Sequence, residues 1–265
     1  MIQFLHVGAE CFPMAKVGGL ADVVGALPKY QCSDGIKANV VMPYYNNLFN
    51  KAHEFKHIFR GSINLGEINH EFQVLELLDE LGFEVFAIKI QHLLDREKIY
   101  GYQDDVERFM AFQIAVLTWI SQKEEKPTLI HCHDHHAGLI PFMMGHCHIF
   151  QNIKEIPTVF TIHNAQYQGQ FGYDKFNYIP QFNFTHFGLL DWDGKINPMA
   201  SAVKCAWKVT TVSPNYMEEL KQNANGLQHL FTMESSKCSG ILNGIDTFVW
   251  NPETDKRINQ QYKVK

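Results

Sequence analysis

The sequence predicts an α/β protein built on a doubly wound, mostly parallel β-sheet. Short apolar runs rich in β-branched residues recur along the chain and alternate with helical patterns, which is typical of strands joined by crossover helices. A chain of 265 residues with 46% hydrophobic content can bury a large core. Polar clusters directly follow four of the expected strands, which is where open α/β sheets bind their ligands.

The expected strands are short apolar runs bounded by turn residues. Two neighbouring runs are joined by only the four residues 79–82, which leaves no room for a crossover helix, so we expect an antiparallel hairpin or edge there. The full set is 2–8, 39–42, 71–78, 83–90, 128–132, 158–162, 208–213 and 239–242.

Three helices are expected between these strands. Residues 106–120 repeat apolar side chains at steps of three and four, which predicts a buried helix. Residues 20–28 form a second helical pattern after a glycine pair. Ser213 is an N-cap residue followed by Pro214 at the first helical position, so a third helix begins there and continues to about Lys221.

Composition excludes two classes of partner. A formal net charge of −5 gives no basic surface excess, so nucleic acid is not an expected partner. Charged residues interrupt every apolar run before it reaches membrane-spanning length, and the chain begins without a basic leader, so we expect no membrane association and a cytoplasmic location. Six cysteines without CxxC spacing are expected to be reduced thiols.

The loop after the first strand predicts an anion site. Lys16 and the pair Gly18 and Gly19 precede the helix at 20–28, so backbone N–H groups and the positive end of a helix dipole converge beside a lysine. The alternative is a tight strand-to-helix turn without a ligand. The loop is neither a Walker A sequence nor a Gly-x-Gly-x-x-Gly fingerprint, because the two glycines are adjacent.

Three further strand-end loops carry amide, imidazole and carboxylate groups. Such groups form directional hydrogen bonds to sugar hydroxyls, so their combination favours a polyhydroxylated ligand. Each loop taken alone also fits an ordinary turn, and Tyr100 also fits a loop anchor with its ring packed down. The polar residues are His133, Asp134, His135 and His136, then His163, Asn164 and Tyr167, then Asn243 and Asp246.

The histidine run raises a metal-dependent hydrolase as an alternative. The run offers several ligands, namely His131, His133, Asp134, His135 and His136. Its aspartate is one residue out of register for a dinuclear His-x-His-x-Asp-His site, and no partner Cys/His pair occurs at ligand spacing. We therefore expect no metal site, and the hydrolase is the least favoured hypothesis.

Five ordered motifs resemble the N-terminal domain of bacterial glycogen synthases and plant starch synthases, which are retaining GT-B glucosyltransferases. The resemblance covers essentially the whole chain and implies a Rossmann-like sheet that forms the N-terminal half of a GT-B fold. The motifs are ECFPMAKVGGLADVVGALP at 10–28, HDHHAGL at 133–139, TIHNAQYQG at 161–169, TVSP at 211–214 and LNGID at 242–246.

The resemblance implies a reaction and a set of site residues. Glucose would pass from ADP-glucose to the non-reducing 4-hydroxyl of an α-1,4-glucan such as glycogen, with retention of configuration and without a metal or cofactor. Lys16 and His163 would be catalytic, the first on the leaving ADP and the second beside an oxocarbenium-like centre. The donor would bind at Lys16, Gly18, Gly19, Asp22 and Asn243, and the acceptor or sugar at Tyr100, Asp134, His136 and Asn164.

Two departures from the family pattern limit this expectation. His135 stands where the family usually has a tryptophan, which replaces a stacking platform with a smaller, titratable ring. By the resemblance, residues 1–245 correspond to the acceptor-side domain and residues 246–265 correspond to an interdomain linker. The second GT-B domain is then expected to be absent from this sequence. We therefore expect a weak or inactive synthase that needs a partner domain or chain. The alternative is a non-catalytic glucan-binding or regulatory module.

Overall fold

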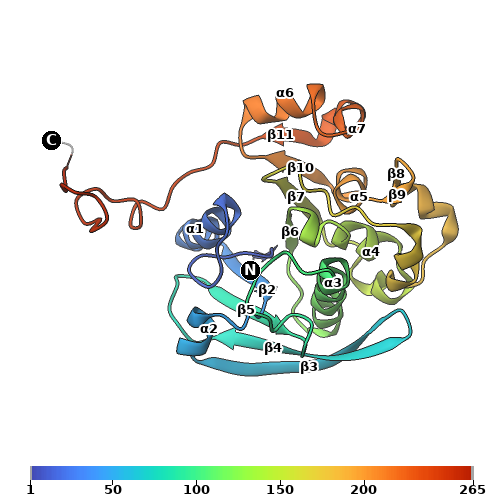
Figure 1. Ribbon diagram of the computed structural model, residues 1–265, viewed down its shortest axis with the longest axis horizontal. Helices are drawn as coiled ribbons and strands as arrows, with labels where there is room; N and C mark the ends of the chain where they lie inside the picture. The colour runs from blue at the N-terminus through green and yellow to red at the C-terminus, as the bar shows by residue number, and fades with distance from the viewer. Residues whose placement is uncertain (1, 264–265) are drawn as a thin grey trace.

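The computed structural model describes residues 2–263, and one mixed β-sheet organises them (Figure 1). The sheet has the strand order β11-β10-β7-β6-β1-β2-β5-β4-β3. Its strands are β1 (Gln3–Val7), β2 (Lys37–Pro43), β3 (Phe55–Leu65), β4 (Ile68–Leu77), β5 (Glu84–Lys89), β6 (Leu129–His133), β7 (Thr158–Ile162), β10 (Lys208–Thr211) and β11 (Cys238–Gly240). A separate small ribbon pairs β8 (Asp191–Trp192) with β9 (Lys195–Ile196).

The strands from β11 to β5 are parallel, as the alternation of strands and helices predicts. The expected hairpin is confirmed, because β4 pairs antiparallel with β5. The structure adds β3, which lies outside β4 along the lower edge of Figure 1. Its sequence, FKHIFRGSINL, intersperses charged and polar residues among the apolar ones and forms no long apolar run, which is why the sequence pattern did not predict it.

Helices cover both faces of the sheet. Alternate residues of β2 show this, since Val41 belongs to one buried cluster while Val40 and Met42 belong to another. The α-helices are α1 (Gly19–Ser33), α2 (Leu48–Ala52), α3 (Asp105–Gln122), α4 (Ile140–His146), α5 (Pro198–Cys205), α6 (Pro214–Gln222) and α7 (Gln228–Met233). Apolar residues of α1 pack into the second cluster, and those of α3, α4 and α5 into the first. The doubly wound fold class is therefore confirmed.

The predicted helices are confirmed with small changes at their ends. α1 begins beside the expected residue and continues through Pro28 to Ser33, and α3 contains the whole of the expected helix. Ser213 caps α6 by accepting a hydrogen bond from the backbone N–H of Tyr216 at 3.0 Å. None of the helices in the described part of the chain combines the length and apolarity needed to cross a bilayer.

The position of β1 creates a crevice in the sheet. The chain leaves β1 toward β2 on one side and later returns with β6 on the other, so the carboxyl ends of β1 and β6 mark a topological switch point. Ligands of open α/β sheets bind at such points. The loops that carry the predicted polar residues begin at these strand ends and at those of β7 and β11.

After β11 the chain runs past the C-terminal half of α1 (Figure 1). Lys29 pairs with Asp246 at 3.2 Å, and the Tyr30 hydroxyl lies 3.2 Å from Thr247 Oγ1. The Lys29 ammonium group also lies over the Phe248 ring. The predicted division of the chain into a domain of residues 1–245 and a linker of residues 246–265 stays a prediction. Met1 of the first segment and residues 264–265 of the second lie outside the described residues.

Candidate active site

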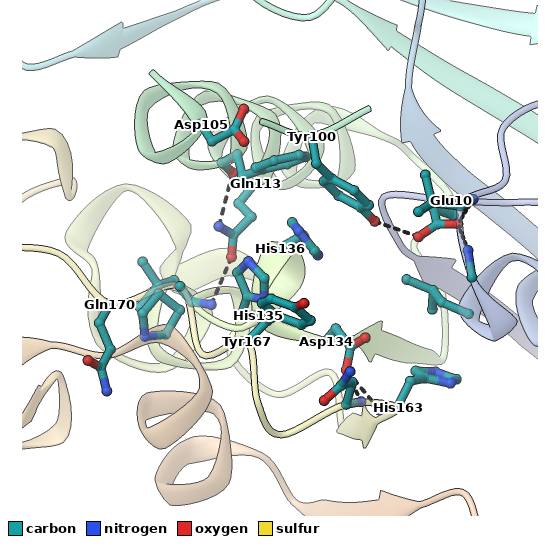
Figure 2. Close-up of a pocket in the computed structure, with 18 of the residues that line it drawn as sticks. Glu10, Tyr100, Asp105, Gln113, Asp134, His135, His136, His163, Tyr167 and Gln170 are labelled. Atoms are coloured by element: carbon teal, nitrogen blue, oxygen red, sulfur yellow. Dashed lines mark hydrogen bonds between the residues drawn. The ribbon is translucent and has the colours of Figure 1, made fainter. Parts of the chain in front are cut away.

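A cavity of about 780 Å³ opens at the switch point of the sheet (Figure 2). It is lined by residues from the loops after β1, β6, β7 and β11, and by α3. Most of the predicted site residues line it, namely Gly18, Gly19, Tyr100, Asp134, His136, His163, Asn164 and Asn243. Lys16 and Asp22 are not among the lining residues, although they flank the glycine pair in the sequence.

The glycine loop is held by carboxylates of its own segment. Glu10 accepts hydrogen bonds from the backbone N–H groups of Val17 and Gly18 at 2.5 and 3.0 Å. The Lys16 ammonium group donates to both carboxylate oxygens of Asp22 at 2.6 and 2.8 Å. The predicted anion-binding groups therefore already have anionic partners inside the protein.

Both glycines of this loop face open space. A Cβ atom built at Gly18 or Gly19 meets no atom within 4 Å. Gly19 is the first residue of α1, so the positive end of that helix lies at the cavity wall. An anionic group of a ligand can approach the backbone here without a steric barrier.

Tyr100 connects the glycine loop to the opposite wall. Its hydroxyl donates a hydrogen bond to Glu10 at 2.8 Å, and its ring stacks on His136 with centroids 4.7 Å apart. Phe109 meets the same imidazole edge to face at 4.4 Å. The ring is packed as a loop anchor and also lines the cavity, so the two interpretations of Tyr100 are compatible.

Asp134 joins the ends of β6 and β7. Its Oδ1 atom accepts from the backbone N–H groups of His163 at 2.8 Å and Asn164 at 3.4 Å. Burial raises the pKa of this carboxyl to about 7, against the opposing effect of those two N–H groups. Its backbone φ of 55° is unfavourable for a residue with a side chain, and such strain is typical of functional sites. Asn164 Oδ1 accepts from Gln166 N, so this residue also forms the turn that its position suggested.

His135 occupies a tight position under the β7 loop. A Cβ atom at Gly169, where φ is +71°, would lie 2.4 Å from the imidazole of His135. Only glycine fits at that point. Burial lowers the pKa of His135 to about 4, and its Nδ1 atom is buried without a hydrogen-bond partner.

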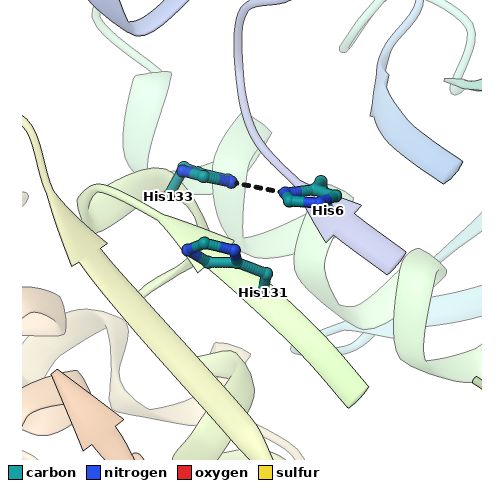
Figure 3. A group of neighbouring side chains, drawn as sticks. All are labelled: His6, His131 and His133. Carbon is teal, nitrogen blue, oxygen red and sulfur yellow. Dashed lines mark hydrogen bonds between the residues drawn. The ribbon is translucent and has the colours of Figure 1, made fainter. Parts of the chain in front are cut away.

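The histidine run does not converge on one site. His135 and His136 line the cavity, whereas His131 and His133 lie on the sheet next to His6 (Figure 3). The nearest nitrogen atoms of His6 and His133 are 3.0 Å apart, which is a hydrogen-bond distance. The rings of His131 and His133 stack with centroids 4.2 Å apart, so their nitrogen lone pairs lie in nearly parallel planes. The ligand set expected for a dinuclear hydrolase is therefore split between two places.

Sequence reasoning did not assign roles to Glu10 and His6. Glu10 opens the first motif, and it makes three of the hydrogen bonds that hold the loop. His6 lies between Leu5 and Val7, both buried, on a strand with helices on both faces. A single polar residue in such a buried strand is the sequence signal that could have identified His6, because a buried polar group needs a hydrogen-bond partner.

Comparison with known proteins identifies relatives along nearly the whole chain. The starch synthase catalytic domain family matches residues 3–233. A glycogen synthase of Flavobacterium johnsoniae is 50% identical over 265 residues, which are all of this chain and 56% of that protein. A glycogen synthase of Halalkalibacterium halodurans is 40% identical over 267 residues, covering 99% of this chain and 55% of that protein. The chain thus spans little more than half the length of these relatives.

A solved structure shows the same architecture. The catalytic domain of starch synthase IV from Arabidopsis thaliana, bound to ADP and acarbose, superimposes with a TM-score of 0.89 and 29% sequence identity. The match covers 98% of this chain and 55% of that one.

Proposed function

Because the chain belongs to the starch synthase catalytic domain family, as its N-terminal half, we propose that it contributes the acceptor side of a retaining glucosyltransferase. The reaction transfers glucose from ADP-glucose to the non-reducing 4-hydroxyl of an α-1,4-glucan. One observation carries the proposal: loops that are far apart in the sequence gather their polar residues around one cavity at the switch point.

The glycine loop is the proposed donor side. Gly18 and Gly19 admit the diphosphate to the backbone, and Lys16 stabilises negative charge on the leaving ADP. Asp22 orients Lys16 through the ion pair between them, and Asn243 borders the same cavity from the β11 loop. The donor phosphate would compete with Asp22 for Lys16.

The opposite side of the cavity is the proposed sugar and acceptor site. His163 lies beside the transferred glucose, where its ring or backbone carbonyl stabilises an oxocarbenium-like centre. Asp134 holds the His163 backbone in place through its N–H group. Tyr100, His136 and Asn164 contact the glucan, and His135 replaces the usual stacking tryptophan with a weaker platform.

The part of the relatives that these 265 residues do not cover should determine turnover. Enzymes that close two domains over a donor rely on closure to exclude water and to align the reacting groups. We therefore expect the chain alone to transfer little glucose, and residues 246–265 to lead into a second domain or to act beside a separate chain.

The test is complementation. The chain is incubated with radiolabelled ADP-glucose and glycogen, alone and with the separately produced C-terminal half of the Flavobacterium johnsoniae relative. We expect transfer only in the mixture, and a loss of about 100-fold in Lys16→Ala. Lys56→Ala on the outer strand is the control and should transfer as the wild type does. Full transfer by Lys16→Ala would contradict the donor role.

One observation favours the second candidate, a glucan-binding module. The donor-side groups already bind Glu10 and Asp22, while the sugar side opens to the cavity. Calorimetry with maltoheptaose and with ADP separates the two. Binding of maltoheptaose without binding of ADP, together with no transfer in the mixture, supports the module.

A further inference from the structure

A line of hydrogen bonds connects helix α1 to the cavity through the interior of the sheet. Gln31 on α1 presents its Oε1 atom to His6 Nε2 at 2.7 Å. His6 Nδ1 then lies 3.0 Å from His133 Nε2, a contact that Figure 3 marks with a dashed line. His133 Nδ1 lies 3.0 Å from His163 Nε2. The line thus ends on His163, a residue that lines the cavity.

Each ring in this line carries one proton. Burial lowers the pKa of His6 and of His163 to about 4, and that of His133 well below its usual value. A neutral imidazole has one N–H group that donates and one bare nitrogen that accepts. Three neutral rings joined in series must therefore all point their N–H groups the same way.

The end at Gln31 sets that direction. A carbonyl oxygen only accepts, so it requires the proton of His6 on Nε2. Nδ1 of His6 then accepts from His133 Nε2–H, and Nδ1 of His133 accepts from His163 Nε2–H. Within residues 2–263 no protein group hydrogen-bonds to the remaining nitrogen, Nδ1 of His163.

We propose that Gln31, His6 and His133 are positioning residues that fix His163 in its Nε2–H tautomer, so that Nδ1 presents a lone pair to the glucose being transferred. The inference rests on the proposed function for the identity of the sugar. A lone pair is the negative end of the imidazole dipole, and it favours the positive charge that develops at an oxocarbenium-like centre. The opposite tautomer would present a positive N–H group there. Asp134 complements the line by holding the His163 backbone.

His131 lies outside the line. Its Nε2 atom is 2.6 Å from Thr161 Oγ1, which in turn is 2.6 Å from Thr210 Oγ1. This second network is on the same face of the sheet and is buried to a similar degree. Thr210→Val is thus a matched control that removes a buried hydrogen bond without touching the line.

The experiment reads the tautomers directly. The chain is produced with ¹⁵N-labelled histidine, and long-range ¹H–¹⁵N spectra at pH 8 distinguish Nδ1–H from Nε2–H rings. The His163 signals are assigned by their loss in His163→Asn. Wild type, Gln31→Glu and Thr210→Val should all show the Nε2–H form of His163. Gln31→Lys can only donate, so it should reverse all three rings and place the His163 proton on Nδ1.

Three results would overturn the proposal. One is a mixed or Nδ1–H form of His163 in the wild type, and another is a His163 tautomer that stays the same in Gln31→Lys while His6 reverses. The third is one equivalent of zinc in the purified chain, measured by elemental analysis, because zinc on His6 and His133 would occupy the nitrogens of the line.

Glucosyl transfer in the complemented mixture tests the link to the sugar. Gln31→Lys should lower kcat about tenfold with a smaller change in KM for ADP-glucose, and Gln31→Glu should retain the wild-type kcat. Reversed rings with unchanged kcat would overturn the role at the sugar. If the wild-type mixture transfers no glucose, the proposed function fails, and the role of His163 at the sugar fails with it. The spectra still decide whether the line of hydrogen bonds sets the tautomer of His163.

Discussion

The cavity has two walls of opposite character. The loop wall, residues 16–22, is held by charged groups near the surface: the Lys16 and Asp22 side chains are 40% and 36% exposed. The imidazole wall, residues 134–136 with His163, is buried, and Asp134 and His136 are each 7% exposed. Half-exposed ion pairs exchange partners at little cost, whereas buried polar groups do not. One wall is thus suited to rearrange around a ligand, and the other to hold a fixed geometry.

Substituting one glycine of the loop wall and one glycine, Gly138, that follows residues 134–136 in the sequence should give the largest contrast. In Gly138→Ala the new Cβ would lie 2.6 Å from the backbone oxygen of Pro198, so the free energy of unfolding should fall by about 2–3 kcal/mol. In Gly18→Ala the Cβ meets nothing within 4 Å, and we expect a change below about 1 kcal/mol. Urea denaturation of both variants checks this. Equal losses would show that the loop wall is packed as tightly as the segment that follows residues 134–136.

The buried histidines should make stability depend on pH. Burial lowers the pKa of His6 from 6.5 to about 4, so its contribution is complete above pH 6.5 and is lost as the pH falls toward 4. Asp134 has a raised pKa, so its contribution to the free energy of unfolding increases as the pH falls, opposite to that of His6. The effect of His6 is therefore read from the difference between a His6 variant and the wild type. When the pH is lowered from 7.5 to 5.5, the free energy of unfolding of His6→Gln should fall by about 1 kcal/mol less than that of the wild type.

The control for this pH effect is His57→Gln, because His57 is exposed on β3. Denaturant unfolding at the two pH values should give the wild-type difference for this variant. A wild-type difference in His6→Gln as well would mean that His6 does not titrate as its burial requires.

Breaking the ion pair of the loop wall should have the smallest effect on the free energy of unfolding. Asp22→Asn removes the partner of Lys16, and we expect the free energy of unfolding to change by less than about 1 kcal/mol because both side chains are partly exposed. Thermal unfolding at low and high salt measures this, since 1 M salt should remove most of the difference between variant and wild type. A loss above 2 kcal/mol would place the pair among the rigid parts of the site.

Sequence patterns predicted the parallel sheet well because its strands are short apolar runs with clear ends. They did not predict β3, an edge strand that mixes charged, polar and apolar residues, nor α4, which is largely buried and therefore has no amphipathic period. The hairpin of β4 and β5 was predicted from its short turn.

The sequence predicted which residues come together at the cavity better than it predicted the contacts between them. Strand-end placement brought Asp134, His163 and Asn243 to one cavity, as expected. It did not reveal that Glu10 occupies the N–H groups of the glycine loop, or that His6 meets His133 across two strands. Such contacts depend on strand order and register, which a local sequence pattern does not contain.

The line from Gln31 to His163 also has an evolutionary consequence. Each of its four positions is acceptable only with a neighbour that supplies the complementary donor or acceptor, so a change at one position alters which residues the others tolerate. Positions 6, 31, 133 and 163 should therefore drift together among descendants of this chain. A library that randomises them one at a time would miss the combinations that work.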